Sequence, residues 1–139
     1  MKAIWSWIQT AFVAIGGTLG WYLGGLDGFL YALIAFVVVD YITGVLRAIV
    51  EKKLSSRIGA HGIAKKVAIF LVVGIGHLID TYLLGGTSAP LRTAVIFFYI
   101  ANEGVSLLEN ATSIGLPVPE KLKDILAQLH ERTDKEDGK

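Results

Sequence analysis

Four long apolar stretches take up most of this 139-residue chain, and three of them contain a carboxylic acid. These acids are Asp40, Asp80 and Glu103. A carboxylate that faces lipid near the bilayer centre costs about 2.5–3.5 kcal/mol on insertion scales, so such residues usually face a bundle, a cavity or a pore. The pattern predicts an all-α integral membrane protein whose function depends on how its helices pair.

The composition excludes several other classes of protein. Hydrophobic residues make up 53% of the chain, which is too apolar for an ordinary soluble domain of this size. The absence of cysteine excludes disulfides, thiolate metal sites and cysteine nucleophiles. No P-loop, GxSxG or HExxH motif occurs, and the three histidines are widely spaced. We therefore expect no enzyme, no cofactor or metal, and no nucleic-acid partner.

The apolar stretches predict about four transmembrane helices in a membrane domain of residues 1–110. The first has tryptophans near both ends, as is typical of helices anchored at two interfaces, and its apolar run is too long for a signal peptide. The last is the weakest, because its strong hydrophobes contribute about 2.5–5 kcal/mol, barely more than Glu103 removes. We therefore expect it to need partner helices. The predicted spans are about residues 3–23, 28–50, 67–84 and 93–109.

The basic residues predict the topology. Of 13 lysines and arginines, only Arg92 lies in the connection between the third and fourth spans. Cytoplasmic loops carry the excess of lysine and arginine, so both termini are expected in the cytoplasm. The connection between spans two and three is interpreted as a topology signal that can also contact anionic lipid headgroups. The basic residues in this connection or next to it are Arg47, Lys52, Lys53, Arg57, Lys65 and Lys66.

Residues 111–139 predict a charged cytoplasmic tail. Apolar residues at helical spacing, from Leu122 to Leu129, indicate a short amphipathic helix over about 119–132, and disorder is expected from about Thr133. Three places for this helix stay open: the membrane surface, a neighbouring subunit or solvent.

Glycines recur at every fourth position in and after the first span, at Gly16, Gly20 and Gly24. Small residues at this spacing let two membrane helices approach closely. The pattern leaves two alternatives open, which are close packing within one bundle and self-association between copies.

Polar residues inside the later spans predict a layer across three helices. His77 is its only expected titratable base, because Arg47 lies about 10 Å closer to the cytoplasm by helical rise. Two acids with one possible cation imply a protonated carboxyl or a wet layer. The layer either holds the helices together through hydrogen bonds or lines a water-filled or transiently opening site. The residues singled out in these spans are Asp40, Thr43, Gly44, His77, Asp80, Asn102, Glu103 and Ser106.

Three sequence blocks together resemble the phage-lysis and toxin-secretion holins of Gram-positive bacteria and their phages. The blocks are the motif D-x-x-T-G at 40–44, the segment 55–62 followed by two lysines, and the segment 102–110 followed by G-L-P-V-P at 115–119. The resemblance covers roughly Val39 to Leu129. Members of this family are often drawn with three spans, whereas four are predicted here.

The resemblance implies a function without catalysis. Such holins accumulate in the host cytoplasmic membrane, oligomerise there, and open timed lesions that release an endolysin or a large toxin. The expected partners are then further copies of the chain, membrane lipids, and the endolysin or toxin. Two alternatives stay open: a small dimeric ion or proton-coupled channel or transporter, and a membrane-anchored assembly factor.

Overall fold

The computed structural model describes the backbone of residues 1–137 and the side chains of residues 1–132. Within this range every regular element is helical, in agreement with the predicted all-α class. The α3 helix continues directly into η1, a short turn of π-helix. The elements are α1 (Lys2–Tyr22), α2 (Gly28–Val50), α3 (Ser56–Leu78), η1 (Ile79–Leu83), α4 (Pro90–Ile114) and α5 (Glu120–Asp137).

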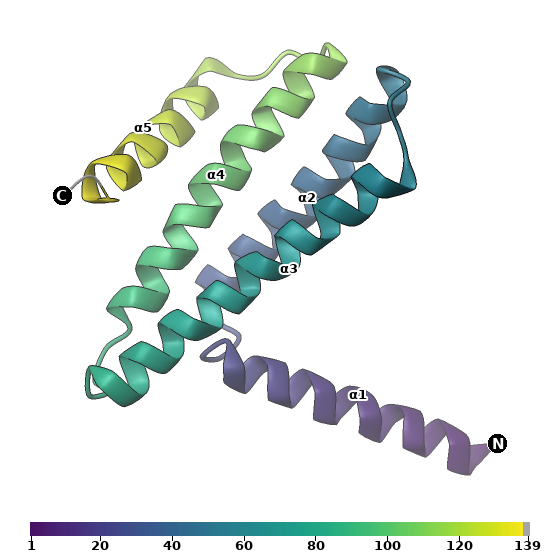
Figure 1. The fold of residues 1–139 in the computed structure, drawn as a ribbon, viewed down its shortest axis with the longest axis vertical. Helices are drawn as coiled ribbons and strands as arrows, with labels where there is room; N and C mark the ends of the chain where they lie inside the picture. Colours follow the sequence, from purple (N-terminus) through teal and green to yellow (C-terminus); the bar gives the residue numbers. More distant parts are fainter. Residues whose placement is uncertain (138–139) are drawn as a thin grey trace.

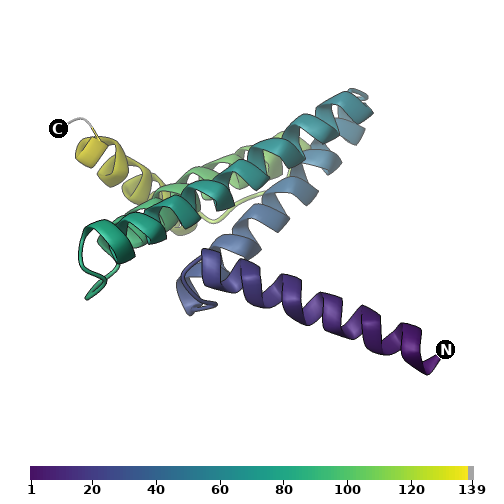
Figure 2. The same ribbon diagram turned by 60° about the horizontal axis from the view of Figure 1, so that its bottom comes forward.

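The central helices α2, α3 and α4 form a bundle, α5 lies along α4, and α1 points away from the others (Figure 1). The turned view in Figure 2 shows the same separation of α1. Three helical segments of the described chain are long and apolar enough to cross a membrane: Gly28–Val50, Ser56–Leu83 and Pro90–Ile114. Although α1 has 21 residues, it is not among them, so the predicted count of four spans is not confirmed.

Local sequence signals explain where these helices begin and end. The side chain of Asp27 accepts a hydrogen bond from the backbone N–H of Leu30 at 2.9 Å and so caps α2. Pro90 occupies the first turn of α4, where its missing N–H costs nothing. Gly115 ends α4 in the left-handed conformation, with φ of 99°.

The helix that contains the predicted third span starts earlier than that span. The helix begins at Ser56 rather than near Val67, so most of the expected basic loop is helical. The Ser55 hydroxyl accepts a hydrogen bond from the N–H of Ile58 at 3.2 Å and starts the helix there. Two lysines at positions 65 and 66 made this stretch look like a loop by hydropathy alone.

The other helix boundaries differ less from the predicted ones. Helix α2 begins and ends at the predicted residues, and α4 is longer than expected at both ends. Helix α5 continues to Asp137, so the expected disorder from Thr133 is wrong up to that residue. Residues 138–139, which the same expectation covered, lie outside the described residues.

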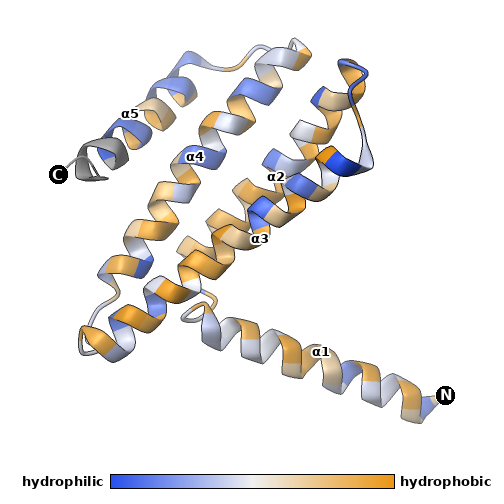
Figure 3. Cartoon of the chain, in the orientation of Figure 1, coloured by the Kyte–Doolittle hydropathy of each residue, from blue (hydrophilic) through white to orange (hydrophobic). Residues whose placement is uncertain are grey.

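An apolar core joins the three central helices. Apolar residues make up much of these helices, as the colouring of Figure 3 shows, and many of them are exposed. Phe29 of α2 and Phe97 of α4 meet edge to face, with ring centroids 5.2 Å apart. An apolar exterior suits helices that contact lipid. The core residues of the central helices are Leu30, Leu33, Val37, Ile69, Val73, Ile96 and Ile100.

Helix α1 has no buried residue and is attached to the bundle only at its C-terminal end. There the Tyr22 hydroxyl donates a hydrogen bond to the carbonyl oxygen of Leu71 at 2.8 Å. The Tyr22 ring occupies the space that a side chain at Gly74 would fill. This glycine therefore provides the close approach by which α1 is joined to α3.

Candidate functional site

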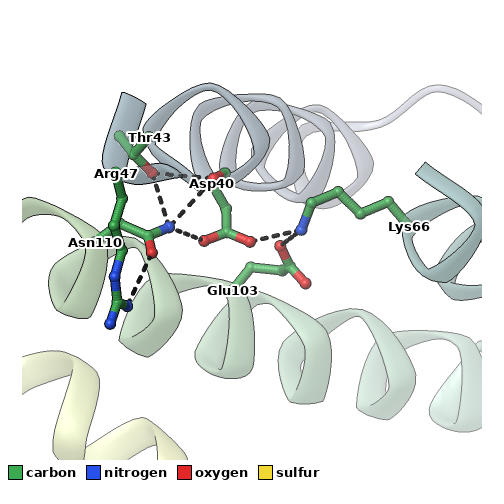
Figure 4. Close-up of polar contacts among 6 residues, drawn as sticks. All are labelled: Asp40, Thr43, Arg47, Lys66, Glu103 and Asn110. Atoms are coloured by element: carbon green, nitrogen blue, oxygen red, sulfur yellow. Dashed lines mark hydrogen bonds and ion pairs between the residues drawn. The ribbon is translucent and has the colours of Figure 1, made fainter. Parts of the chain in front are cut away.

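A lysine held between two carboxylates lies inside the bundle (Figure 4). The Nζ atom of Lys66 on α3 lies 2.5 Å from Oδ2 of Asp40 on α2. The same atom lies 2.7 Å from Oε2 of Glu103 on α4. Exposed fractions of 15%, 7% and 10% for the side chains of Lys66, Asp40 and Glu103 show that all three are largely buried. This cluster therefore joins the three central helices through charge.

The cluster lies near the middle of the helices that carry it. Lys66 is ten residues into α3, which places it about 15 Å from the start of that helix. Asp40 and Glu103 occupy central positions of α2 and α4. Charged groups in the middle of long apolar helices are tolerated when they are buried and paired with one another, as these are.

An asparagine extends the cluster along α2 and α4. The Nδ2 atom of Asn110 donates to Oδ1 of Asp40 at 3.0 Å and to Oγ1 of Thr43 at 3.1 Å. Its Oδ1 accepts a longer hydrogen bond from Arg47 at 3.5 Å. A Cβ at Gly44 would lie in van der Waals contact with the Asn110 amide, at 3.6 Å, so Gly44 also faces α4. The D-x-x-T-G block is thus a docking surface for α4.

A cavity of about 420 Å³ opens beside the cluster, between α3, α4 and α5. A cavity of this size with polar walls has room for several water molecules, which need two or more polar partners each. The arrangement can therefore hold water against buried charges. The polar residues that line it include Asp40, Lys66, Asn102, Glu103, Ser106 and His130.

A second buried cation, Arg92, lies where α4 begins, with only 4% of its surface exposed. Its Nε donates to the carbonyl oxygen of Leu23 at 2.5 Å, and its Nη2 donates to that of Gly25 at 2.9 Å. Its Nη1 lies 2.7 Å from Oδ2 of Asp27. The hydrogen bond from Arg92 lowers the pKa of Asp27 below its ordinary value of 3.8. Arg92 thus ties the α1–α2 turn to α4.

Asp80 and Gly24 complete this second site. The Asp80 carboxylate accepts hydrogen bonds from the backbone N–H groups of Leu91 at 3.0 Å and Arg92 at 2.8 Å, and so satisfies the start of α4. Gly24 has φ of +85°, and a Cβ there would lie 2.7 Å from Arg92 Nε and from His77 Nδ1. A residue with a side chain would fit neither the turn nor the space.

The structure brings together only part of the predicted polar layer. Asp40, Thr43, Gly44 and Glu103 meet, and Asn102 and Ser106 line the adjoining cavity. His77 does not join them, because it lies about 16 Å farther along α3 than Lys66 and contacts Thr81 at 3.4 Å. The expectation that His77 is the base of this layer is wrong, and Lys66 takes that place. Asp80 also lies apart, in the Arg92 site.

The basic residues assigned to topology divide into two groups. Lys66 points into the bundle, so in this conformation it does not meet lipid headgroups. Arg47 is partly exposed and forms an ion pair with Glu51 at 3.2 Å. The others are exposed near the same end of the bundle: Lys52, Lys53, Arg57 and Lys65.

Of the three glycines assigned to helix packing, only Gly24 is closely packed within the chain. A Cβ on Gly16 would have no neighbour within 4 Å, and a Cβ on Gly20 would meet only the Leu26 side chain, at 3.8 Å. Gly24 belongs to the turn. Of the two alternatives, close packing inside one bundle is therefore wrong for Gly16.

Sequence reasoning missed Lys66 as a partner of the acids, Arg92 as a buried anchor, and Asn110 as a link. One signal could have identified Lys66. Two carboxylates inside predicted spans require a nearby cation. Lys66 is spaced three residues from Ile69, which is four residues from Val73, so Lys66 lies on the same helix face as two apolar residues. No group of histidine or acidic side chains in the described part of the chain is arranged to hold a metal ion.

Comparison with known proteins identifies the family. The model of the bacteriophage holin family matches residues 17–131. An uncharacterised 14.9 kDa protein of Clostridium perfringens is 40% identical over 132 residues, covering 95% of this chain and 99% of the relative. A probable holin of Bacillus phage phi105 is 37% identical over 120 residues, covering 84% and 87%. No solved structure matches. The chain belongs to the bacteriophage holin family.

Proposed function

We propose that this chain is a holin that oligomerises in the host cytoplasmic membrane and opens timed lesions. These lesions release an endolysin, or in another setting a large toxin, and no reaction is catalysed. Family membership supports this role, and so does the similarity to a phage protein named a probable holin. The observation that carries the proposal is a bundle with an apolar exterior and a charged cluster between its helices.

Such a bundle suits a protein that changes from a closed to an open assembly. Hydrogen bonds between membrane helices contribute about 0.6 kcal/mol each, so contacts within a subunit can be exchanged for similar contacts between subunits. The Asp40–Lys66–Glu103 cluster offers both charges for that exchange. A polar cluster that is hidden in one arrangement can then face water in another.

The proposed topology places the α2–α3 connection in the cytoplasm, with Lys52, Lys53 and Arg57 near its membrane surface. Residues 1–110 form the membrane domain, and residues 111–139 form a cytoplasmic tail. Both termini are cytoplasmic if α1 crosses the membrane as a fourth span. Gly16 and Gly20 on its exposed surface are then available for self-association.

The test is inducible expression in bacteria, with and without a coexpressed endolysin that lacks an export signal. Culture density and membrane potential are followed together. The holin role predicts an abrupt loss of membrane potential on expression of the chain, and lysis only when the endolysin is present. Steady growth with an intact membrane potential would contradict it.

The polar cavity favours one alternative, a small dimeric ion or proton-coupled channel or transporter. Intramembrane charges beside water are typical of ion and proton pathways. This alternative predicts solute flux through liposomes that contain the purified chain, without lysis of cells that also make the endolysin. The same expression experiment therefore separates the two functions.

A further inference from the structure

Helix α5 contacts α4 at the depth of the charged cluster. Leu126 is buried, with 5% of its surface exposed, and its Cδ2 lies 2.8 Å from the position of a Cβ on Gly104. Gly104 follows Glu103 and is ten residues from the end of α4, or about 15 Å along the helix. The contact therefore lies near the middle of a predicted span and not at the membrane surface.

The opposite face of α5 is charged and exposed. Because α5 runs back along α4 from the α4–α5 loop, residues after Leu126 lie still farther from that end of the bundle (Figure 1). Figure 3 shows polar residues along much of α5. Hydrocarbon does not accommodate such a face, given the insertion cost of each charged side chain. The exposed polar residues are Lys121, Asp124, Gln128, Glu131 and Arg132.

The same helix also forms part of the wall of the cavity beside the cluster. His130 of α5 is part of the cavity wall, together with Lys66 of α3 and Glu103 of α4. Among the described side chains of α5 only Leu126 is buried, and α4 is the one helix along which the α5 backbone packs. A helix at the edge of a fold that packs on one neighbour can open locally without unfolding the rest.

We propose that α5 is a displaceable cover on the water-facing side of the bundle. It docks through Leu126 against Gly104, restricts access from bulk water to the Asp40–Lys66–Glu103 cluster, and opens the cavity further when it leaves. The water-facing side of each subunit is then the α4–α5 side, and the other faces of α2 and α3 contact lipid. The cover itself does not depend on the proposed function. Only the idea that α5 leaves before a lesion opens rests on that function.

Cysteine labelling tests the cover directly, because the chain contains no native cysteine. A membrane-impermeant, charged methanethiosulfonate is applied to open membrane fragments that contain full-length single-cysteine variants. Gln128→Cys, on the outer face of α5, is expected to react readily. Val38→Cys, which is exposed on α2, is expected to stay unreactive because lipid covers it. Equal protection of the two cysteines would overturn the proposal.

The second arm measures release of α5. Ser106→Cys lies in the cavity wall, and Leu126→Glu is added to remove the docking contact. Ser106→Cys is expected to react about tenfold faster when Leu126→Glu is present than when Leu126 is unchanged, because local opening exposes the site. The matched control is Ile125→Glu, a neighbouring exposed position on α5, which should leave the rate unchanged. An equal rate with Leu126 and Leu126→Glu would contradict the cover.

Two readouts keep the interpretation clear. If Leu126→Glu unfolded the bundle, Val38→Cys would become reactive in the same background, and the contact would then be structural and not a cover. Labelling is read without lysis, so it also separates the two proposals. A chain that labels as expected but never permeabilises cells would overturn the holin role and leave the cover standing.

Discussion

The two buried cations of this bundle are held in different ways. Arg92 lies at the end where α4 begins and donates to two backbone carbonyls and one carboxylate of the α1–α2 turn. Lys66 lies in the middle and pairs with carboxylates from two other helices. One site therefore fixes a turn, whereas the other holds helices together.

The chemistry of the two side chains matches these tasks. A guanidinium is planar and presents its donors in fixed directions, which suits a rigid set of carbonyls. An ammonium is a compact charge on a flexible stem and adapts to partners that move. The Arg92 end of the bundle therefore suits a fixed geometry, whereas the Lys66 cluster beside a cavity suits partners that change position.

Removal of the Lys66 charge is expected to have the largest effect. Lys66→Met leaves Asp40 and Glu103 buried without a cation, which should destabilise the bundle by about 3–5 kcal/mol. Thermal unfolding in detergent micelles measures the loss. Lys65→Met is the matched control, because the neighbouring Lys65 is exposed. Equal losses for the two variants would show that the cluster does not hold the bundle together.

Exchange of the two cations should give a smaller but asymmetric effect. Arg92→Lys cannot reach all three of its acceptors, and one unpaired buried acceptor costs about 1–3 kcal/mol. Lys66→Arg still meets both carboxylates and should cost less. The same unfolding measurement ranks the two variants. The reverse order would contradict the assignment of Arg92 as the rigid anchor.

The link through Asn110 should contribute less again. Asn110→Ala removes its hydrogen bonds to Asp40 and Thr43, but Asp40 keeps Lys66, so a loss of about 1 kcal/mol is expected. Thr112→Ala, at an exposed position on the same helix, serves as the control in the unfolding measurement. Equal stability of Asn110→Ala and Thr112→Ala would mean that water can replace the hydrogen bonds of the Asn110 amide.

The smallest effect concerns pH at the Arg92 end. The hydrogen bond from Arg92 lowers the pKa of Asp27. The ionised carboxylate therefore stabilises the fold at pH values above its ordinary pKa of 3.8. That contribution is lost as the pH falls through the lowered pKa. The Asp27 side chain is 47% exposed, so the effect should be small. Melting temperatures of wild type and Asp27→Asn should converge in acid, and a constant difference would argue against the ion pair.

The parts of the fold that depend on local signals were predictable from the sequence. Helix α2 is uninterrupted by basic residues until its last turn, and the amphipathic spacing from Leu122 to Leu129 indicated α5. The start of α3 was not predicted, because hydropathy treats Lys66 as a loop residue. Its place inside the bundle depends on carboxylates 26 and 37 residues away in the chain.

The candidate site was predicted in part for the same reason. Periodicity placed Asp40, Thr43 and Gly44 on one face of a helix, and that face does contact α4. Depth within a span was estimated from predicted span centres, and the error in α3 moved His77 into the wrong layer. Arg92 looked like a loop charge, since its partners are backbone carbonyls that carry no sequence signal.

We propose that the charged cluster controls when this holin-family protein permeabilises the membrane. The most direct test follows membrane potential after induced expression of wild type, Glu103→Gln and Glu103→Leu at matched membrane levels. Glutamine keeps an acceptor for Lys66, so its timing should stay close to that of wild type, whereas leucine should delay the loss of potential. If both variants behave as wild type, the cluster has no role in opening the membrane.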